Sequence, residues 1–406
     1  MSKPSFLIVG ANFTNKGAEA MLKTVQHKIL QRYEDAVIYA ICHENESELA
    51  SMQGIIPLYV DRSSLGIFMG KVAGKLRKTF KLKSKPYADY TPAEKLPQIK
   101  NLKTAIDVSG FAYGDKGGYI QPLETLKVMD FCKKSDAPYI FMPQAWGGFS
   151  DPQVAANCRK MLSRTDTFFA RDEVSRTYLA NLLQKPAKDM YLLPDIAFHF
   201  PIPTLDGKKI LADCGYENPL DRPVLGISPN MRIYEKYPER GPENEYLKLL
   251  LDVIESLKNS YHIVLIPNEI RPEGAQERDD AYLCKTLYEA IPANENVTLI
   301  SGYRSAEEIK AIIRETDLLI ASRFHSLIFA LSLGIACMAI SWSHKYRELF
   351  ALFEMEHYVV EHKDMNTKYV LELFDELQNE RGALETKISK ILPELKAKNE
   401  GVFDFL

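Results

Sequence analysis

The sequence predicts an α/β protein built from two successive doubly wound units, and three observations support this fold class. Short apolar segments alternate with longer segments of helical periodicity through most of the chain. The short segments are apolar on both faces, which is typical of parallel sheets covered by helices on both sides. The chain has 406 residues, which is too long for one ordinary core and favours two domains of roughly 200 residues.

The first half contains six apolar segments that are expected to form strands. They are SFLIVG (5–10), AVIYAIC (36–42), KTAIDVSG (103–110), APYIFMPQ (137–144), DTFFARD (166–172) and DMYLLPD (189–195). After the first of these, residues 16–33 place apolar side chains three or four positions apart, which predicts a helix. We therefore expect residues 1–200 to form an N-terminal α/β domain.

The alternation restarts after a polar, proline-containing stretch at 200–222, which is the expected linker. Strands are predicted at 223–230, 261–268, 296–301, 317–322 and 336–341, and helices at 243–259, 275–290, 305–315 and 325–333. This pattern predicts a C-terminal α/β domain at 201–365. The tail, 366–406, is expected to be helical, with two helices within 366–395. These helices could pack back across the two domains.

Two doubly wound, Rossmann-like domains that face a central cleft form the GT-B-like plan. Ligands of such folds bind beyond the carboxyl ends of the strands, so side chains that follow strands are the first candidates for a functional site.

Composition excludes several classes of function. The net charge of −3 gives the molecule no overall attraction to nucleic acid. The six cysteines are scattered and form no C-x-x-C pair, which is typical of reduced thiols in the cytoplasm. The eight histidines show no H-x-x-x-H or H-E-x-x-H spacing, so no metal site is expected. The sequence has no signal peptide pattern and no apolar run long enough to span a membrane, which predicts a cytoplasmic protein.

A basic segment, LGIFMGKVAGKLRKTFKLKSK (65–85), differs from the rest of the chain. Residues 71–85 hold seven lysines or arginines and no acidic residue, and apolar side chains recur every three or four positions. This pattern predicts an amphipathic helix that contacts an anionic membrane surface or a lipid-linked substrate. The alternative is a solvated helix whose apolar stripe packs on the domain core.

Arg323 and His325 form the strongest candidate site. They follow the strand DLLIAS (317–322) and begin the next helix, where backbone N–H groups attract anions. The planar guanidinium of Arg323 suits carboxylate or phosphate, and the imidazole of His325 can exchange a proton near neutral pH. A structural alternative is that His325 caps the helix while Arg323 forms an ion pair between the domains.

Two further strand ends supply polar side chains near the same edge. Ser228, Asn230 and Arg232 follow the strand at 223–230, and we expect Arg232 to approach the same crevice as Arg323. Lys345 follows the strand at 336–341 and offers another positive charge. Arg232 in a surface loop and an ordinary exposed lysine are the alternatives.

The sequence resembles the polysaccharide pyruvyl transferase family in four segments that occur in order. They are NFTNKGAEAML (12–22), FFARDEVSRTYL (168–179), LLPDIAF (192–198) and SRFHSLIFALSLGIACMAISWSHK (322–345), the last with an Arg-x-His motif. One departure is Gly17-Ala18, where many members have Gly-Asp, and it leaves an acceptor-binding role of that aspartate unsupported in this chain.

This resemblance implies transfer of a pyruvyl group from phosphoenolpyruvate to a hexose of a polysaccharide or of its lipid-linked precursor. The product would be a cyclic ketal, phosphate would be released, and no cofactor would be required. The resemblance places Arg232, Arg323, His325 and the backbone of Phe324 at the donor. The other side chains that follow these strands, Ser228, Asn230 and Lys345, are further expected donor contacts. The residue chemistry agrees, because phosphoenolpyruvate is a small molecule with about three negative charges that suits arginines and a helix start. In this hypothesis His325 is the general acid or orients the phosphate, while the arginines stabilise the anion.

The acceptor sugar is then expected on the N-terminal domain. Candidate contacts are Asn15, Gly17, Asp107, Gly110 and Gln144, which lie at predicted strand ends. Asp107 has a carboxylate that can accept a hydroxyl proton. The alternatives are that Asp107 caps a helix, that the glycines only permit turns, and that Trp146 belongs to the core instead of stacking on a sugar.

Two other functions compete with this hypothesis. A GT-B glycosyltransferase that uses a nucleotide sugar would share the architecture, although many retaining members carry glutamates in the region where SRFHSLIFALSLG has no acid. An inactive scaffold that recruits assembly enzymes to a membrane through 65–85 is the other. Thermal-shift binding of phosphoenolpyruvate and release of phosphate from it would separate these three functions.

Overall fold

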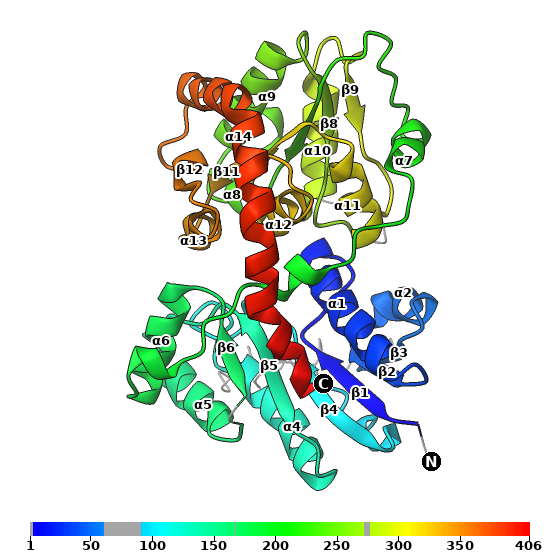
Figure 1. Ribbon diagram of the computed structural model, residues 1–406, viewed down its shortest axis with the longest axis vertical. Coiled ribbons are helices and arrows are strands. Elements are labelled where there is room, and N and C mark those ends of the chain that lie inside the picture. Colours follow the sequence, from blue (N-terminus) through cyan, green and yellow to red (C-terminus); the bar gives the residue numbers. More distant parts are fainter. Residues whose placement is uncertain (1–2, 61–90, 166, 272–276) are drawn as a thin grey trace, which may run out of the picture. The chain divides into compact units, whose positions relative to one another are not determined.

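The computed structural model describes residues 3–60, 91–165, 167–271 and 277–406. The chain forms two compact units (Figure 1). Unit 1 contains Met1–Phe13, Val25–Leu193 and Val402–Leu406, and unit 2 contains Thr14–Thr24 and Pro194–Gly401. The sequence placed the boundary after residue 200, whereas the chain passes into unit 2 at Pro194. The reason is that the short helix η4 (Ile196–His199) packs on α12 of unit 2 (Phe324–Ser332).

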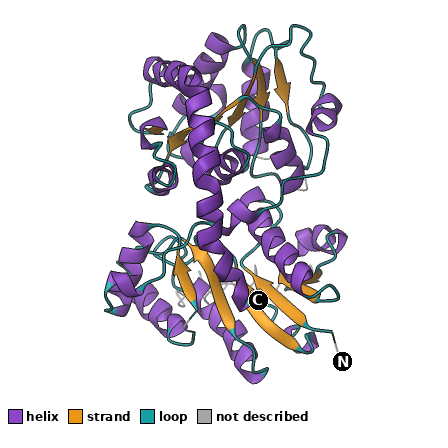
Figure 2. Cartoon of the chain, viewed as in Figure 1, coloured by secondary structure: helices purple, strands orange, loops and turns teal. Residues whose placement is uncertain are grey.

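Unit 1 contains a six-stranded sheet in the order β3-β2-β1-β4-β5-β6, and every adjacent pair is parallel. Its strands are β1 (Ser5–Val9), β2 (Val37–Ile41), β3 (Ile56–Leu58), β4 (Leu102–Asp107), β5 (Tyr139–Gln144) and β6 (Phe168–Ala170). Its helices are α1 (Lys16–Arg32), α2 (Ser47–Met52), α4 (Ile120–Lys134), α5 (Pro152–Leu162) and α6 (Glu173–Leu183), although the first part of α1 belongs to unit 2. Strands β1 and β5 are buried along their whole length, as expected for a sheet covered on both faces. Figure 2 shows the strands and the helices of the chain in different colours.

Unit 2 contains a second six-stranded parallel sheet, in the order β12-β11-β10-β7-β8-β9. Its strands are β7 (Val224–Ser228), β8 (His262–Leu265), β9 (Val297–Leu299), β10 (Leu318–Ala321), β11 (Cys337–Ser341) and β12 (Val359–Glu361). Its helices are α7 (Gly207–Asp213), α8 (Met231–Tyr234), α9 (Glu245–Leu257), α10 (Asp280–Ala290), α11 (Ala306–Arg314), α12, α13 (Lys345–Ala351) and α14 (Thr367–Glu400). Strand order reverses between β7 and β10, which is the position where doubly wound sheets bind ligands.

The segment Thr14–Thr24 joins unit 2 through backbone hydrogen bonds. Lys16 N donates to Asn268 O at 2.9 Å and Ile270 N donates to Thr14 O at 2.9 Å, and between them Asn15 forms an antiparallel bridge with Glu269. The start of α1 therefore lies beside the loop that follows β8.

Three details of the predicted organisation were wrong. Residues 189–195 do not form a strand, because they contribute only the isolated bridge between Ala170 and Leu192. The polar stretch at 200–222 contains α7. The tail forms one helix, α14, instead of two, since its only proline, Pro393, comes late and an apolar stripe from Val370 to Leu395 keeps helical spacing throughout.

A buried histidine at the start of β8 makes the stability of unit 2 dependent on pH. His262 is 1% exposed, and its Nε2 lies 2.8 Å from Thr298 Oγ1. Burial, with a smaller contribution from the charge of Arg222, lowers the pKa of His262 from 6.5 to about 4. The neutral form is therefore favoured in the folded state, and protonation favours unfolding.

We expect stability to fall as pH decreases from about 6.5 to about 4, by roughly 1–3 kcal/mol from this group. In His262→Gln, which keeps a hydrogen-bonding side chain without the titration, this contribution should disappear. Denaturant unfolding at several pH values measures the effect. His43→Gln, at an exposed histidine outside unit 2, is the control for the substitution itself. An unchanged pH profile in His262→Gln would contradict the assignment.

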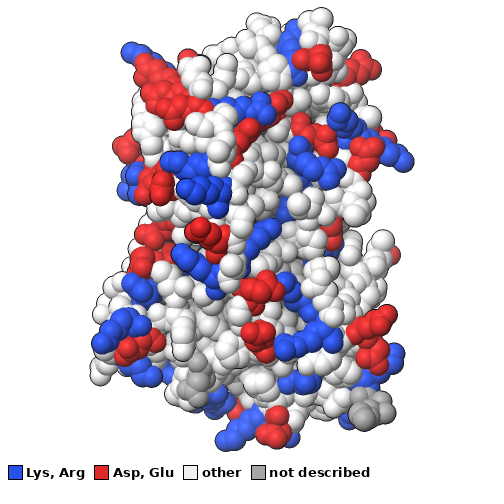
Figure 3. Space-filling view, viewed as in Figure 1, with Lys and Arg blue, Asp and Glu red and all other residues white. Residues whose placement is uncertain are grey.

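Charged side chains of both signs are intermixed over the face shown in Figure 3, in agreement with the small net charge. In the part of the chain that the structure describes, no helix is long and apolar enough to cross a membrane. The basic segment 65–85 lies outside the described residues, so its contact with a membrane stays a prediction.

Candidate functional site

The carboxyl ends of β7 and β10 lie side by side in unit 2, with Ser228 paired to Ala321. Ser228 Oγ lies 2.9 Å from Ser326 Oγ on α12, and Asn230 Nδ2 donates to Ser322 O at 2.6 Å. Asn230 also caps α8 by accepting a hydrogen bond from Arg232 N at 2.8 Å. Both predicted donor contacts, Ser228 and Asn230, are only 1% exposed. Their side chains therefore join the two strand ends, and their predicted contact with the donor is not supported by this geometry.

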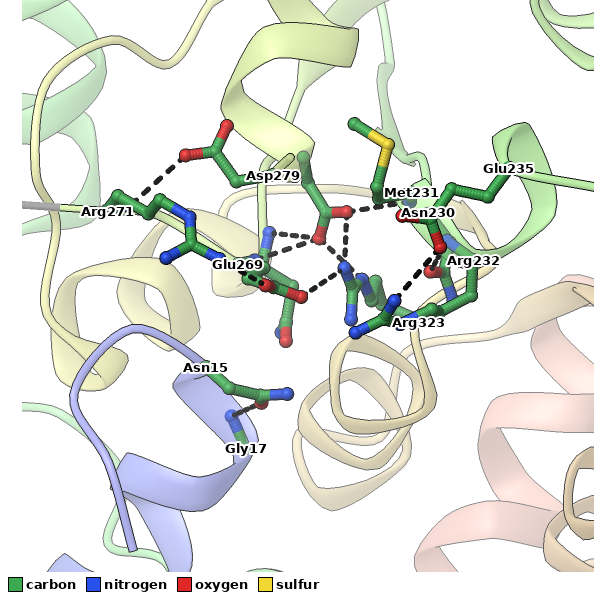
Figure 4. A network of polar contacts seen from close by, with 12 residues as sticks. Asn15, Gly17, Asn230, Met231, Arg232, Glu235, Glu269, Arg271, Asp279 and Arg323 are labelled. Atoms are coloured by element: carbon green, nitrogen blue, oxygen red, sulfur yellow. Dashed lines mark hydrogen bonds and ion pairs between the residues drawn. The ribbon is translucent and has the colours of Figure 1, made fainter. Parts of the chain in front are cut away.

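Arg323 lies between two carboxylates at this edge (Figure 4). Its Nη2 donates to Glu269 Oε2 at 2.8 Å and to Asp280 Oδ1 at 2.6 Å, and its Nε lies 2.5 Å from Asp280 Oδ2. Among the described residues, its Nη1 group has no partner. One side of the guanidinium is thus held by carboxylates, which leaves Nη1 for a ligand, and the role of Arg323 as an anion clamp stays a prediction.

Asp280 is the buried residue that holds this arrangement together. Its carboxylate is fully buried at the first position of α10 and accepts hydrogen bonds from the backbone N–H groups of Met231 at 3.0 Å, Asn268 at 3.3 Å and Glu269 at 2.8 Å. Burial raises the pKa of Asp280, and the positive charge of Arg323 opposes that shift. The chain after β7, the chain after β8 and the start of α12 therefore meet at one carboxylate.

Arg232 differs from Arg323 in its exposure. Its side chain is 54% exposed and its Nη1 lies 2.9 Å from Glu235 Oε2. An exposed ion pair three residues apart on a helix contributes less than about 1 kcal/mol, so an incoming anion can replace Glu235 at little cost. Arg232 follows Met231, whose N–H shares Asp280 Oδ1 with Arg323, so the backbones that carry the two arginines lie next to each other (Figure 4).

His325 occupies the first turn of α12, and its side chain is 13% exposed. Its Nε2 lies 3.7 Å from Asp195 Oδ2, and a carboxylate at this distance stabilises positive charge on the imidazole. On another side it contacts the backbone of Gly17, where a Cβ atom would lie only 1.9 Å from His325 Nδ1. Only glycine leaves room for the imidazole at this position.

Asn15 and Gly17 were predicted to contact the acceptor from the N-terminal domain, and this placement was wrong. Both residues belong to unit 2. Asn15 Oδ1 accepts a hydrogen bond from Gly17 N at 2.9 Å and so caps α1. Their backbone lies beside Glu269 and His325, which makes them part of the same site as Arg323 (Figure 4).

Lys345 and Phe324 pack together beside the start of α12. The Lys345 ammonium lies 4.9 Å from the ring centroid of Phe324 and 5.0 Å from that of Trp342. Such cation–π contacts fix the position of the ammonium. Lys345 therefore brings its positive charge close to the first residue of the helix that carries His325.

In unit 1, Asp107 does not have the predicted role of accepting a hydroxyl proton from the acceptor. It is 0% exposed. Its Oδ2 accepts hydrogen bonds from Tyr113 at 2.5 Å and Tyr139 at 2.8 Å, and its Oδ1 accepts one from Ser109 N at 2.9 Å. Burial raises the pKa of Asp107. This carboxylate stabilises the end of β4 and is not accessible to a substrate.

Two other residues of the same edge have structural roles. Gly110 adopts a φ of +70°, which favours glycine, and its carbonyl accepts a hydrogen bond from Ala145 N at 2.8 Å. Trp146 is 1% exposed, donates through Nε1 to Phe169 O at 2.9 Å and stacks on Tyr113. Gly110 therefore shapes the turn after β4, and Trp146 belongs to the core.

Gln144 is as buried as Ser228 and Asn230, but unlike them it lacks hydrogen-bond partners for its side-chain amide. It is the last residue of β5 and is 1% exposed, yet neither its Oε1 nor its Nε2 has a hydrogen-bond partner among the described residues. Ser109 Oγ and Asp172 Oδ2, at the ends of β4 and β6, are also buried without a partner there. Each such group is destabilising by about 1–3 kcal/mol, and a bound hydroxyl compound would remove that penalty.

Three acidic residues of the site were not predicted from the sequence. Glu269 and Asp280 were missed, although Glu269 follows the predicted strand at 261–268 and that position was a usable signal. Asp195 lies in LLPDIAF, which was assigned to the domain junction and not to the site. No group of three or more His, Cys, Asp or Glu side chains in the described ranges is arranged to hold a metal ion.

A buried charge network beside the site was also missed. Lys16 and Glu19 are both 0% exposed, and Lys16 Nζ donates to Glu19 Oε2 at 2.9 Å. Lys23 pairs with Glu19 at 3.2 Å and with Glu307 on α11. This network attaches the start of α1 to unit 2.

The sequence profile of the family described as polysaccharide pyruvyl transferase matches residues 15–344. The match covers most of the chain and includes the Arg-x-His turn and the loop that packs on it.

The chain belongs to the polysaccharide pyruvyl transferase family.

Membership identifies the protein as an enzyme of polysaccharide biosynthesis. A sequence search among curated proteins gives no significant match. Several solved structures have a similar fold. The Anabaena protein Alr3699/HepE, determined with UDP-glucose, is 11% identical with a TM-score of 0.58 over 98% of both chains.

Two UDP-GlcNAc 2-epimerases also have a fold similar to that of this chain. UDP-GlcNAc 2-epimerase from Methanocaldococcus jannaschii is 11% identical with a TM-score of 0.56 over 92% of both chains. The enzyme from Neisseria meningitidis, bound to UDP-GlcNAc, is 14% identical with a TM-score of 0.54 over 95% of this chain and 94% of that one. At these identities the likeness concerns the fold, and it confirms the predicted GT-B-like architecture with two Rossmann-like domains.

Proposed function

We propose that this member of the pyruvyl transferase family transfers the pyruvyl group of phosphoenolpyruvate to two hydroxyls of a saccharide, forms a cyclic ketal and releases phosphate. The observation that carries the proposal is the position of His325. A side chain that can exchange a proton stands on the first turn of α12, two residues after Arg323, at the carboxyl edge of the sheet. The exposed Arg232 follows the neighbouring strand, β7, and its backbone meets Arg323 at Asp280.

Donor binding follows from the charges at this edge. Phosphoenolpyruvate carries a phosphate and a carboxylate, each of which is recognised by guanidinium groups and helix starts. In this proposal Arg232 exchanges Glu235 for the donor, and Arg323 contacts it through Nη1 while Asp280 fixes the guanidinium. Lys345 adds positive charge near Phe324. Glu269 and Asp280 neutralise part of the positive charge of Arg323. Arg232 therefore contributes more than Arg323 to the attraction of the donor.

The reaction needs a proton donor close to the methylene carbon. Protonation of C3 by His325 makes C2 electrophilic, and the first hydroxyl then attacks C2. The bond between C2 and the phosphate oxygen breaks, phosphate leaves, and the second hydroxyl closes the ketal ring. One of the two hydroxyl protons restores the proton that His325 gives to C3, and the other is taken up by the released phosphate. Asp195 stabilises the protonated imidazole.

Glu269 is the carboxylate best placed to accept a hydroxyl proton. Its side chain is 13% exposed, whereas Asp280 beside it is fully buried. It is also held against the Asn15 backbone, so its position is fixed by both Arg323 and the loop before α1.

The deciding experiment is incubation of the purified protein with phosphoenolpyruvate and a panel of free, polymeric and lipid-linked glycosides. Release of inorganic phosphate together with the mass gain of one pyruvyl ketal would support the proposal. Thermal stabilisation by a nucleotide sugar but not by phosphoenolpyruvate would instead favour a glycosyltransferase, and absence of both would contradict the proposal.

Gln144 provides a prediction about the acceptor. We expect Gln144→Leu to raise the acceptor KM by at least about tenfold, because one or two hydrogen bonds to the saccharide are lost. The free protein should be as stable as wild type or slightly more stable, since an unpaired buried amide is removed. Steady-state kinetics and denaturant unfolding measure the two effects. Gln153→Leu, at an exposed position of α5, is the control, and an unchanged KM in Gln144→Leu would contradict the acceptor contact.

A further inference from the structure

Unit 2 contains a pocket that is separate from the residues around His325. It has a volume of about 370 Å³ and is lined by Lys236, Tyr237, Glu245, Leu249, His362, Lys363 and Met365. This volume is in the range of small-molecule sites. None of the lining residues belongs to the proposed donor or acceptor contacts, so the pocket has no role in the reaction derived above.

Three chain segments line this pocket, and two of them are joined by hydrogen bonds; the third is α9, which carries Glu245 and Leu249. Lys236 and Tyr237 follow α8, and His362 and Lys363 follow β12. Tyr237 Oη donates to His362 O at 2.9 Å, and the two rings meet edge to face with centroids 6.4 Å apart. His362 N donates to Ser341 O at 2.8 Å, which attaches this wall to the end of β11. The pocket is therefore held by backbone and side-chain hydrogen bonds and not only by surface side chains.

The charges of the pocket favour an anion. Lys236 and Lys363 form no ion pair with any described residue. His362 lies with them, and its Nδ1 is buried without a hydrogen-bond partner in the described part of the chain. Burial and the charge of Lys236 lower the pKa of His362, with a smaller effect of Lys363 and an opposing one of Glu361. A bound oxyanion would oppose both lysine charges.

The remaining walls suit a sugar ring. The Tyr237 ring, Leu249 and Met365 offer an apolar surface for the C–H face of a pyranose. Glu245 lines the same pocket and can accept hydrogen bonds from hydroxyls, but it would repel a second anionic group. A bare phosphate would use only the basic wall, whereas a sugar with one oxyanion would use all of them.

We propose that this pocket binds a saccharide unit that carries one oxyanionic group, phosphate or carboxylate, as a second glycan site of the enzyme. A phosphorylated precursor and a pyruvylated product share this chemistry. Binding of an anionic saccharide here does not depend on the proposed reaction. Only the choice of the ketal carboxylate as a ligand rests on the proposed function.

The test is titration of the whole protein, without phosphoenolpyruvate, by calorimetry. The probes are galactose 1-phosphate, a methyl galactoside 4,6-pyruvate ketal, the neutral methyl galactoside and inorganic phosphate. We expect one or both anionic sugars to bind at least about tenfold more tightly than the neutral glycoside and inorganic phosphate. Lys236→Ala/Lys363→Ala should weaken that binding at least about tenfold, while Lys285→Ala/Lys390→Ala, which removes the same charge from exposed helix positions of unit 2, should not.

A second measurement locates the ligand. The pKa of His362, followed by NMR of its imidazole, should rise when the anionic sugar binds, and His362→Gln should abolish the signal. Tighter binding of galactose 1-phosphate would indicate a phosphorylated precursor as the ligand, and tighter binding of the pyruvate ketal would indicate the product. The proposal would be overturned if the lysine double variant bound the anionic sugar as tightly as wild type does. It would also be overturned if inorganic phosphate or the neutral glycoside bound to the wild-type protein as tightly as the anionic sugar. Because no phosphoenolpyruvate is present, such a failure is distinct from failure of the proposed reaction.

Discussion

Replacement of His325 by alanine is expected to lower the rate of phosphate release from phosphoenolpyruvate by about 10²–10⁴-fold, which is the usual contribution of a general acid. In the proposed reaction the imidazole on the first turn of α12 gives the proton, and Asp195 Oδ2 lies 3.7 Å from its Nε2. The melting temperature should stay close to that of wild type, because the side chain is partly exposed and α12 remains packed through its apolar residues. Steady-state phosphate release and thermal unfolding measure the two effects.

Two variants serve as controls for this prediction. His344→Ala removes an exposed histidine near α13 and should retain activity. Gly17→Ala places a methyl group where the imidazole lies and should lower activity while His325 is still present. Near-normal turnover in His325→Ala would reject the proton-donor role. Normal turnover in Gly17→Ala would show that the position of the imidazole is not critical.

Asp280→Ala is expected to destabilise unit 2 by about 3–5 kcal/mol and to abolish activity. The substitution leaves three backbone N–H groups without their acceptor and leaves the buried guanidinium of Arg323 with Glu269 alone. Loss of a partner from a buried ion pair is costly because the remaining charge is still desolvated. Denaturant unfolding measures the loss.

The neighbouring aspartate provides a matched control for Asp280. Asp279 is also buried, but it caps α10 by accepting a hydrogen bond from Tyr282 N at 3.0 Å. Asp279→Ala should destabilise by about 1 kcal/mol and leave the site in place. If the two variants were equally stable, Asp280 would not have the central role that its contacts indicate.

The fold was predictable because its signals are local. Apolar strands alternating with amphipathic helices indicate two parallel sheets wherever they occur, and β1, β5, β7 and β10 are recognisable from sequence alone. Residues 189–195 have the same apolar character, yet they pair with β6 through one bridge only. Apolar composition predicts burial, but strand pairing depends on neighbours that are distant in sequence.

The site was predictable only in part, for a related reason. His325 and Arg323 were found because the end of a strand and the start of a helix are visible in one short segment. The carboxylates that surround them come from the turn after β8 and from α10, and no local pattern connects Glu269 or Asp280 with Arg323. Asn15 and Gly17 were assigned to the wrong domain because the sequence gives no sign that the start of α1 pairs with residues 268–270.

The attachment of Thr14–Thr24 to unit 2 has a consequence for dissecting the enzyme. A fragment that starts at Pro194 would lack Lys16, Glu19 and Lys23, so Glu307 would lose its lysine partner and His325 would lose the glycine backbone against which it lies. Such a fragment should be unstable by itself, and a synthetic peptide of residues 14–24 added in trans should partly restore it. Truncation at Pro194 would therefore separate the imidazole that we propose as proton donor from the Gly17 backbone, which comes from the opposite end of the polypeptide.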